Sequence, residues 1–307
     1  MGAAIDFSGY LRRLGVGRER PSVDGLKALH RAHAERVPYE CLEIWLGRAT
    51  TVEPGDSIGR ILHGRGGYCF HLNGAFSELL RELGYAVTRH YGGVQGNAGL
   101  TAGATGNHLV LTVSGLPSDE APGGEWLVDL GMGDGIYEPL PLVEGEYRQG
   151  PFTYRLSRSV VEPGGWRFEH DPRGGFLGMD FRSGSVEMPA FAERHQELST
   201  SPESGFVRVA TVQRRDAGGT DVVRGLVLTR VGDDQRRVTL ERRDDYFAAL
   251  ADVFGITLDD ADRDRLWPRL VAAHERWSAL GDGQGGQAGD GLHVEADAGG
   301  VPAVGGE

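Results

Sequence analysis

The sequence predicts an α+β fold of three domains followed by a tail, from its periodicity and composition. Apolar residues recur at helical spacing before residue 85, whereas short β-branched and aromatic runs separated by glycines dominate residues 86–200. Residues 201–280 mix both patterns, and residues 281–307 are rich in glycine and poor in large apolar side chains. We therefore expect an N-terminal helical bundle (1–85), a central β-barrel (86–200), a C-terminal α/β lid (201–280) and a disordered acidic tail (281–307).

Capping residues place the first helices. The side chains of Asp6 and Ser22 can accept hydrogen bonds from free N–H groups, so each is expected to begin a helix. A shorter helix is expected over 57–62. A fourth helix begins at Cys69, directly after two glycines. Its buried face is marked by apolar residues at positions i, i+3, i+4 and i+7, namely Phe76, Leu79, Leu80 and Leu83.

Strands are indicated by β-branched and aromatic runs between turn-forming residues. We expect them at 86–91, 107–113, 126–130, 152–158, 206–214, 222–230 and 236–242. Helical patterns return at 244–254 and 262–279. The glycine-rich segment 92–106 is expected to be a surface loop, although it ends beside His108 and could form one wall of a pocket.

Cys69 lies where the local sequence best suits a reactive thiol. At the N-terminus of a helix, N–H groups without partners and the positive end of the helix dipole stabilise a thiolate, which is the nucleophilic form of cysteine. The structural alternative is a small buried residue that opens a helix, since free cysteine is among the most buried residue types. Whether Cys69 is a reactive thiol or a buried structural residue depends on the side chains that lie beside it in the fold.

His108 and Asp129 are the candidate partners. The turn-rich segment 115–124 joins their two predicted strands, so the strands are expected to form an antiparallel hairpin. Alternation along each strand then puts His108 and Asp129 on one face, within cross-strand reach at ~5 Å between Cβ atoms. A carboxylate beside an imidazole stabilises the imidazolium, which can keep a nearby cysteine as thiolate. Taken singly, His108 is explained as a strand-end residue and Asp129 as a turn residue.

Together these segments resemble the arylamine N-acetyltransferase family, which includes amide synthases of antibiotic biosynthesis. The resemblance is carried by Arg65-Gly66-Gly67-Tyr68-Cys69, by His108 at the start of a strand, and by Asp129-Leu130-Gly131-Met132-Gly133. Residues 29–42 and 204–209 are also similar to family segments. The resemblance implies a cysteine-protease-like core, a catalytic triad of Cys69, His108 and Asp129, and substrate-binding residues at Tyr39, Phe70, His71, Met132 and Phe206.

Three positions depart from the family pattern. His71 stands where Glu or Gln is common, Cys41 where Asn is usual, and Met132 where Phe is usual. These changes leave the triad residues intact. They alter the surface around the triad, and therefore bear on the choice of acyl donor and amine.

The chemistry implied is acyl transfer in two steps. Cys69 attacks an acyl thioester, acetyl-CoA or another acyl donor, and the acyl-cysteine then passes its acyl group to a small-molecule amine, giving ping-pong kinetics. No permanently bound cofactor is expected. An amide synthase that takes its acyl chain from a carrier protein is the first alternative. A cysteine hydrolase has the same triad order and is the second, and a non-catalytic binding descendant is a further one.

Composition and charge indicate which binding partners and which cellular compartment we expect. A formal net charge of −12 argues against nucleic-acid binding, although five carboxylates of that excess lie in the tail. No apolar run approaches ~18 residues and the first residues lack a signal-peptide pattern, so neither membrane spanning nor export is expected. A disulfide between Cys41 and Cys69 would block the nucleophile, which favours the reducing cytoplasm.

His30 and His33 could share a metal ion, because they are three residues apart on one helix face. No third ligand is evident in the sequence, so we expect a surface pair and no metal site.

Overall fold

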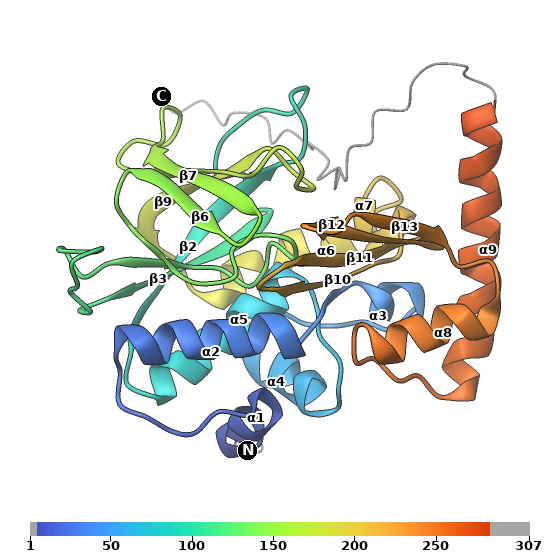
Figure 1. Cartoon of the computed structure of the whole chain (residues 1–307), viewed down its shortest axis with the longest axis horizontal. Coiled ribbons are helices and arrows are strands. Elements are labelled where there is room, and N and C mark those ends of the chain that lie inside the picture. The colour runs from blue at the N-terminus through green and yellow to red at the C-terminus, as the bar shows by residue number, and fades with distance from the viewer. Residues whose placement is uncertain (1–4, 283–307) are drawn as a thin grey trace.

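Helices α1, α2 and α4 of the N-terminal region lie around α5, the helix that begins at Cys69 (Figure 1). The structure is a computed structural model and describes residues 5–282, so most of the predicted tail lies outside the described residues. The helices of this region are α1 (Phe7–Leu14), α2 (Val23–Arg36), α3 (Leu42–Trp45), α4 (Pro54–Leu62) and α5 (Cys69–Glu82). The two predicted caps are present: the Asp6 carboxylate accepts the N–H of Gly9, and the Ser22 hydroxyl accepts the N–H of Gly25.

An antiparallel sheet curls into the nearly closed barrel of the middle of the chain (Figure 1). Its strand order is β5-β4-β3-β2-β9-β8-β7-β6. The bounds are β2 (Ala86–Gln95), β3 (His108–Ser114), β4 (Trp126–Val128), β5 (Leu140–Pro141), β6 (Gly145–Gln149), β7 (Phe152–Arg158), β8 (Trp166–Glu169) and β9 (Gly178–Ser185). Aromatic side chains such as Phe168 and Phe181 fill the interior.

A second antiparallel sheet pairs a short strand of the N-terminal region with four strands from the last third of the chain. Its order is β1-β10-β11-β12-β13, with bounds β1 (Tyr39–Glu40), β10 (Thr211–Asp216), β11 (Gly219–Arg224), β12 (Val227–Gly232) and β13 (Arg236–Thr239). Along the chain, α6 (Ala192–Thr200) and α7 (Gly205–Arg208) lie between β9 and β10. Helices α8 (Arg243–Asp252) and α9 (Asp260–Asp282) follow β13. β1 pairs with β10 on one side, and Tyr39 forms a parallel bridge with Gly67 on the other, so β1 connects the segment just before Cys69 to the last third of the chain.

Strand β3 is buried on both faces, which places its first residue between two cores. Leu109, Leu111 and Val113 pack into the core shared with the helices. Val110 points into the separate core of the barrel. The α+β fold predicted from the sequence is confirmed, with β3 as the strand that separates the helical layer from the barrel interior.

Two predicted strands were wrong in the third region. The strand expected at 206–214 begins only at Thr211, because the Ser204 hydroxyl caps α7 by accepting the N–H of Phe206. The strand expected at 222–230 is two strands, β11 and β12, which turn at Gly225 with φ +56°. β-Branched residues flank this turn on both sides, so the periodicity of the sequence does not indicate it.

The glycine-rich segment 92–106 is shorter as a loop than expected, because β2 continues to Gln95. Gly93 explains why this part of the strand needs glycine. A Cβ there would collide with the carbonyl oxygen of Gly103 and lie 2.6 Å from the backbone nitrogen of Thr105. The loop therefore folds back onto the strand instead of projecting from it.

We predict that Gly93→Ala lowers the free energy of unfolding by about 1–3 kcal/mol, because backbone atoms would have to move to admit the methyl group. Gly184 in β9 is the matched control, since a Cβ there meets nothing within 4 Å. Gly184→Ala should change stability by less than about 1 kcal/mol. Urea denaturation of the three proteins tests this, and equal midpoints would contradict the close approach at Gly93.

Candidate active site

Cys69 is the first residue of α5 and is buried, with 3% of its surface exposed. The first hydrogen bond between residues four apart runs from the N–H of Leu72 to the carbonyl oxygen of Tyr68. The N–H of Cys69 precedes it and therefore has no acceptor within the helix. The sulfur lies 3.6 Å from the carbonyl oxygen of Asn107, at the start of β3. The thiol is thus held between the start of a helix and the start of a strand.

His108 and Asp129 meet as the predicted hairpin requires. Strand β4 ends at Val128, opposite Leu111, so Asp129 follows directly and turns back toward the start of β3. Nε2 of His108 lies 2.7 Å from Oδ2 of Asp129. Burial lowers the pKa of His108, but the negative charges of Asp129 and Cys69 outweigh it and raise that pKa to about 10. At neutral pH the ring is therefore an imidazolium beside the thiol.

Asn73 holds the Asp129 carboxylate in place, and sequence reasoning missed it. Its Nδ2 donates to Oδ1 of Asp129 at 2.9 Å and to the carbonyl oxygen of Leu109 at 2.6 Å. Its Oδ1 accepts the N–H of Leu130 at 2.8 Å. The signal was available, because Asn73 is a polar residue one turn after Cys69 on the same helix.

Gly131 completes the support of Asp129 and lies against Cys69. Its N–H donates to Oδ1 of Asp129 at 2.8 Å. A Cβ on Gly131 would lie 2.6 Å from both Cα and Cβ of Cys69, so only glycine lets this loop approach so closely.

An ion-pair network fixes the loop that leads into Cys69. Arg65 lies 3.0 Å from Oε1 of Glu40 and 2.6 Å from Oε1 of Glu43. Glu40 also accepts the N–H of Gly66 at 3.2 Å. A Cβ on Gly66 would collide with the carbonyl oxygen of Pro38. The Arg-Gly-Gly segment is therefore bound along β1, which sets where α5 begins.

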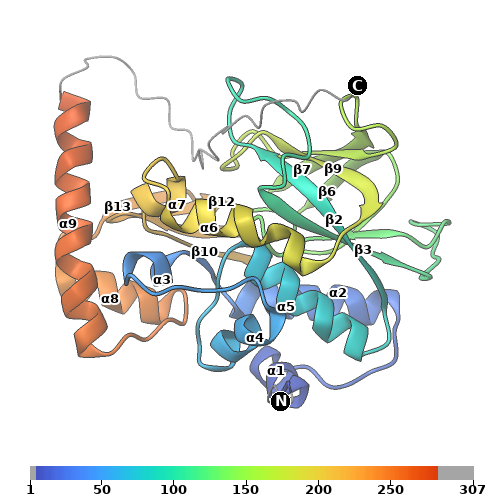
Figure 2. The same ribbon diagram turned by 180° about the vertical axis from the view of Figure 1, so that it is seen from behind.

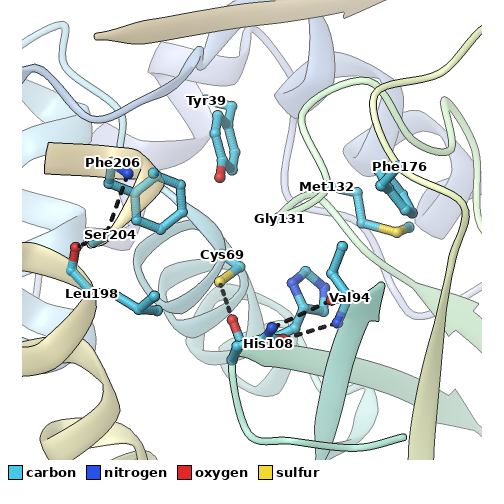
Figure 3. A pocket seen from close by; sticks show the side chains of 12 residues that line it. Tyr39, Cys69, Val94, His108, Gly131, Met132, Phe176, Leu198, Ser204 and Phe206 are labelled. Atoms are coloured by element: carbon cyan, nitrogen blue, oxygen red, sulfur yellow. Dashed lines mark hydrogen bonds between the residues drawn. The ribbon is translucent and has the colours of Figure 1, made fainter. Parts of the chain in front are cut away.

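A cavity that is partly open to solvent lies in front of Cys69. In Figure 3, three residues from the α6–α7 region stand on one side of the thiol and three from the barrel region on the other, with Tyr39 above. The lining residues are Tyr39, Cys69, Val94, Asn107, His108, Gly131, Met132, Phe176, Leu198, Ser204, Gly205 and Phe206. Most of these side chains are apolar, which suits acyl and aryl groups.

Of the side chains expected to bind substrate, Tyr39, Met132 and Phe206 line the cavity. Phe70 and His71 do not border it. Phe70 is fully buried against Phe191, with ring centroids 5.0 Å apart, and His71 lies beneath the ring of Tyr68. Successive residues on a helix point about 100° apart, so the residues after Cys69 turn away from the cavity and into the core. Val94, Phe176 and Leu198 line it instead.

The expectation of a surface pair at His30 and His33 was wrong, because both side chains are fully buried. Nδ1 of His30 lies 2.9 Å from the carbonyl oxygen of Tyr137, and Nε2 of His33 lies 2.7 Å from the Tyr10 hydroxyl. Burial lowers their pKa values to about 4 and about 3, so both rings are neutral and pack on Phe76 of α5. Within residues 5–282, no three His, Cys, Asp or Glu side chains cluster to hold a metal ion.

The thiol of Cys41 has a different environment from that of Cys69. Cys41 is buried, and burial raises its pKa to about 12. Its sulfur accepts the N–H of Thr211 at 3.2 Å. Cys41 is therefore a neutral thiol that joins β1 to β10.

Within residues 5–282, no helix combines the length and the apolar character that a membrane span requires.

We predict that His108→Gln slows the reaction of Cys69 with iodoacetamide at pH 7 by about tenfold or more, because wild-type His108, whose pKa is raised to about 10, is an imidazolium that stabilises a thiolate beside it. Measuring both proteins in a Cys41→Ser background leaves one thiol. Equal rates for the two proteins would contradict the pairing.

Asn73→Ala should slow this alkylation at pH 6 and lower the free energy of unfolding by about 1–3 kcal/mol, because buried partners lose their hydrogen bonds. Ser77→Ala is the matched control. Ser77 lies one turn further along α5 and bonds the buried Arg89, away from the triad. It should lose stability without slowing alkylation. Slower alkylation in both variants would show that Asn73 acts only through general stability.

Comparison with known proteins agrees with this geometry. A sequence model of the N-acetyltransferase family matches residues 22–263. The arylamine N-acetyltransferase of Mycolicibacterium smegmatis is 31% identical over 284 residues, which cover 85% of this chain and 96% of that protein. Proansamycin X synthase of Amycolatopsis mediterranei is 34% identical over 152 residues, covering 47% of this chain and 56% of that protein.

Solved structures give the same result. The arylamine N-acetyltransferase from Mycobacterium abscessus superposes with a TM-score of 0.76 at 26% identity, covering 87% of this chain and 95% of that one. The Mycobacterium marinum arylamine N-acetyltransferase in complex with CoA gives 0.75 at 26% identity, covering 86% and 98%. Because the family model spans most of the sequence and one relative matches over nearly its whole length, this chain belongs to the arylamine N-acetyltransferase family and is an enzyme.

Proposed function

We propose that this enzyme transfers an acetyl group from a thioester donor to a small-molecule amine through an acyl-Cys69 intermediate. The observation that carries the proposal is the Cys69 thiol beside the His108–Asp129 pair, at the floor of an apolar cavity. Acetyl-CoA is the donor we favour, because a structurally similar arylamine N-acetyltransferase was solved in complex with CoA.

In the first half-reaction, the Cys69 thiolate attacks the carbonyl carbon of the thioester. A new S–C bond forms to Cys69 and the S–C bond to the donor breaks. The His108 nitrogen that does not face Asp129 gives its proton to the departing thiolate, and His108 becomes neutral. The N–H of Cys69 at the start of α5 is the nearest donor for the developing oxyanion.

In the second half-reaction, the amine attacks the acyl-cysteine. A C–N bond forms, the bond from the acyl carbon to Cys69 breaks, and neutral His108 takes the proton of the amine. These steps restore the thiolate–imidazolium pair. Asp129 keeps the ring oriented through both steps, because Asn73 and Gly131 fix its carboxylate. Donor and acceptor thus react in turn, which gives ping-pong kinetics.

The walls of the cavity favour an aromatic amine as acceptor. Tyr39 and Phe206 present their rings to it, with centroids 6.5 Å apart, and an arylamine could pack between or against them. Apolar walls also keep water from the acyl-cysteine, which favours transfer over hydrolysis.

An amide synthase is the second candidate. The observation that favours it is the 34% identity to proansamycin X synthase over 152 residues. In this alternative, a carrier protein delivers a larger acyl chain to Cys69. The amine that accepts the chain belongs either to the acyl chain itself or to a separate small molecule. Under either function we place the enzyme in the cytoplasm, where reducing conditions keep both free cysteines as thiols.

Incubation with acetyl-CoA should add one acetyl group to the intact protein, because the Cys69 sulfur borders the cavity beside the imidazolium of His108. Cys69→Ala should carry no adduct, and Cys41→Ser should carry a full one. Addition of aniline should then remove the adduct faster than water does. Mass spectrometry of the intact protein reads all four states.

The other outcomes separate the alternatives. An adduct formed only from a carrier-bound acyl chain would select the amide synthase. An adduct that water removes as fast as amine does would select a hydrolase. No adduct from any thioester would overturn the proposed function.

A further inference from the structure

We propose that Tyr68 is a positioning residue whose hydroxyl, bonded to His195, fixes the wall of the cavity formed by α6 and α7 and so sets which acyl groups reach Cys69. This inference rests on the proposed acyl transfer. Tyr68 itself does not border the cavity. It acts through the wall, which we define as Leu198, Ser204, Gly205 and Phe206.

The bond between Tyr68 and His195 is buried and has a defined direction. The Tyr68 hydroxyl lies 2.5 Å from Nδ1 of His195, and Nε2 of His195 lies 2.7 Å from the carbonyl oxygen of Thr50. A carbonyl can only accept, so the ring proton of His195 is on Nε2 and Nδ1 accepts the Tyr68 O–H. Burial raises the pKa of Tyr68 and lowers that of His195, which keeps both groups neutral.

From His195 the link runs along the wall. Leu198 follows one turn later on α6, and its carbonyl oxygen accepts the Ser204 O–H at 2.5 Å. Ser204 in turn caps α7 through the N–H of Phe206. The Phe206 ring stacks on the ring of Tyr68, with centroids 4.7 Å apart and planes at 28°. Tyr68 therefore holds the wall at both ends, and it is the residue directly before the nucleophile.

His71 supports Tyr68 from below. Its ring meets the Tyr68 ring edge-on at 4.4 Å, and its Nδ1 accepts the N–H of Tyr68 at 3.3 Å. It also meets the His195 ring at 5.3 Å. Besides burial, the positive charge of Arg60 lowers the pKa of both histidines, so no second cation forms beside them. The departure from the family pattern at His71 thus belongs to this cluster and not to the cavity.

The arrangement of the elements fits this role. Figure 2 shows α6 passing near the start of α5, with α7 beyond it. In Figure 3, Leu198, Ser204 and Phe206 face Cys69 from the side opposite Val94, Met132 and Phe176. The position of this wall sets the width of the space above the thiol, and the Tyr68–His195 bond fixes its α6 end. Loss of that bond should admit larger acyl groups without altering the triad.

The test compares wild type, Tyr68→Phe and Tyr85→Phe. Tyr85→Phe is the matched control, because the Tyr85 hydroxyl bonds Ser22 near the other end of α5. The first readout is kcat and KM for acetyl-CoA and hexanoyl-CoA with aniline. The second is hydrogen exchange of residues 192–208 followed by mass spectrometry, with α2 as the internal reference. Iodoacetamide alkylation of Cys69 checks that the triad is intact.

We expect Tyr68→Phe to reduce the preference for acetyl over hexanoyl by about 3- to 10-fold, mainly through a lower KM for hexanoyl-CoA. Exchange of residues 192–208 should accelerate by a similar factor, whereas alkylation should stay within about twofold of wild type. His195→Leu should shift preference and exchange at least as far, because it removes the same bond and also the bond to the carbonyl oxygen of Thr50. Adding Tyr68→Phe to His195→Leu should change little, because the bond that they share is already lost.

Three results would overturn the inference or part of it. Preference and exchange both equal to those of Tyr85→Phe would overturn it entirely. Faster exchange with unchanged preference would overturn the selectivity role and support the anchor alone. If wild type accepts neither donor, the proposed function fails, and the exchange measurement still decides whether Tyr68 anchors the wall.

Discussion

The buried pair of His108 and Asp129 beside the Cys69 thiol is the constraint on which the rest of the structure depends. Charges removed from water are costly unless each is paired and hydrogen-bonded. Asp129 meets this requirement through His108, Asn73 and the N–H of Gly131. Because these groups come from α5, from β3 and from the loop after β4, all three segments must meet at one point. The helical layer and the barrel are therefore held together by the same contacts that prepare the thiol.

Such a meeting requires backbones to approach more closely than side chains allow. Gly131 lies against Cys69, and Gly66 lies against the carbonyl oxygen of Pro38. Arg65 then fixes the approach by pairing with Glu40 and Glu43. The glycines and the arginine around Cys69 thus have a structural reason: they let α5 begin where its thiol lies beside His108.

Part of this arrangement was predictable because it is local. The caps at Asp6 and Ser22 and the helix start at Cys69 depend on neighbours within one turn, which the sequence displays. The alternation that brings His108 to Asp129 needs only a hairpin. Contacts with distant segments could not be read in this way. His71 is buried beside α6, far along the chain, and Phe206 lies in a helical turn although its neighbours favour a strand.

A similar contrast separates the residues around the Cys69 thiol from those that form the wall of the cavity. Cys69, Asn73, His108 and Asp129 all lie before residue 130, and Asp129 binds both His108 and Asn73 through short hydrogen bonds. One wall of the cavity comes from residues 198–206, which belong to α6, α7 and their connection. A change in that wall can alter the shape of the acyl site while the ion pair keeps its partners. In this chain the contact between Tyr68 and His195 is where the start of α5 meets that wall.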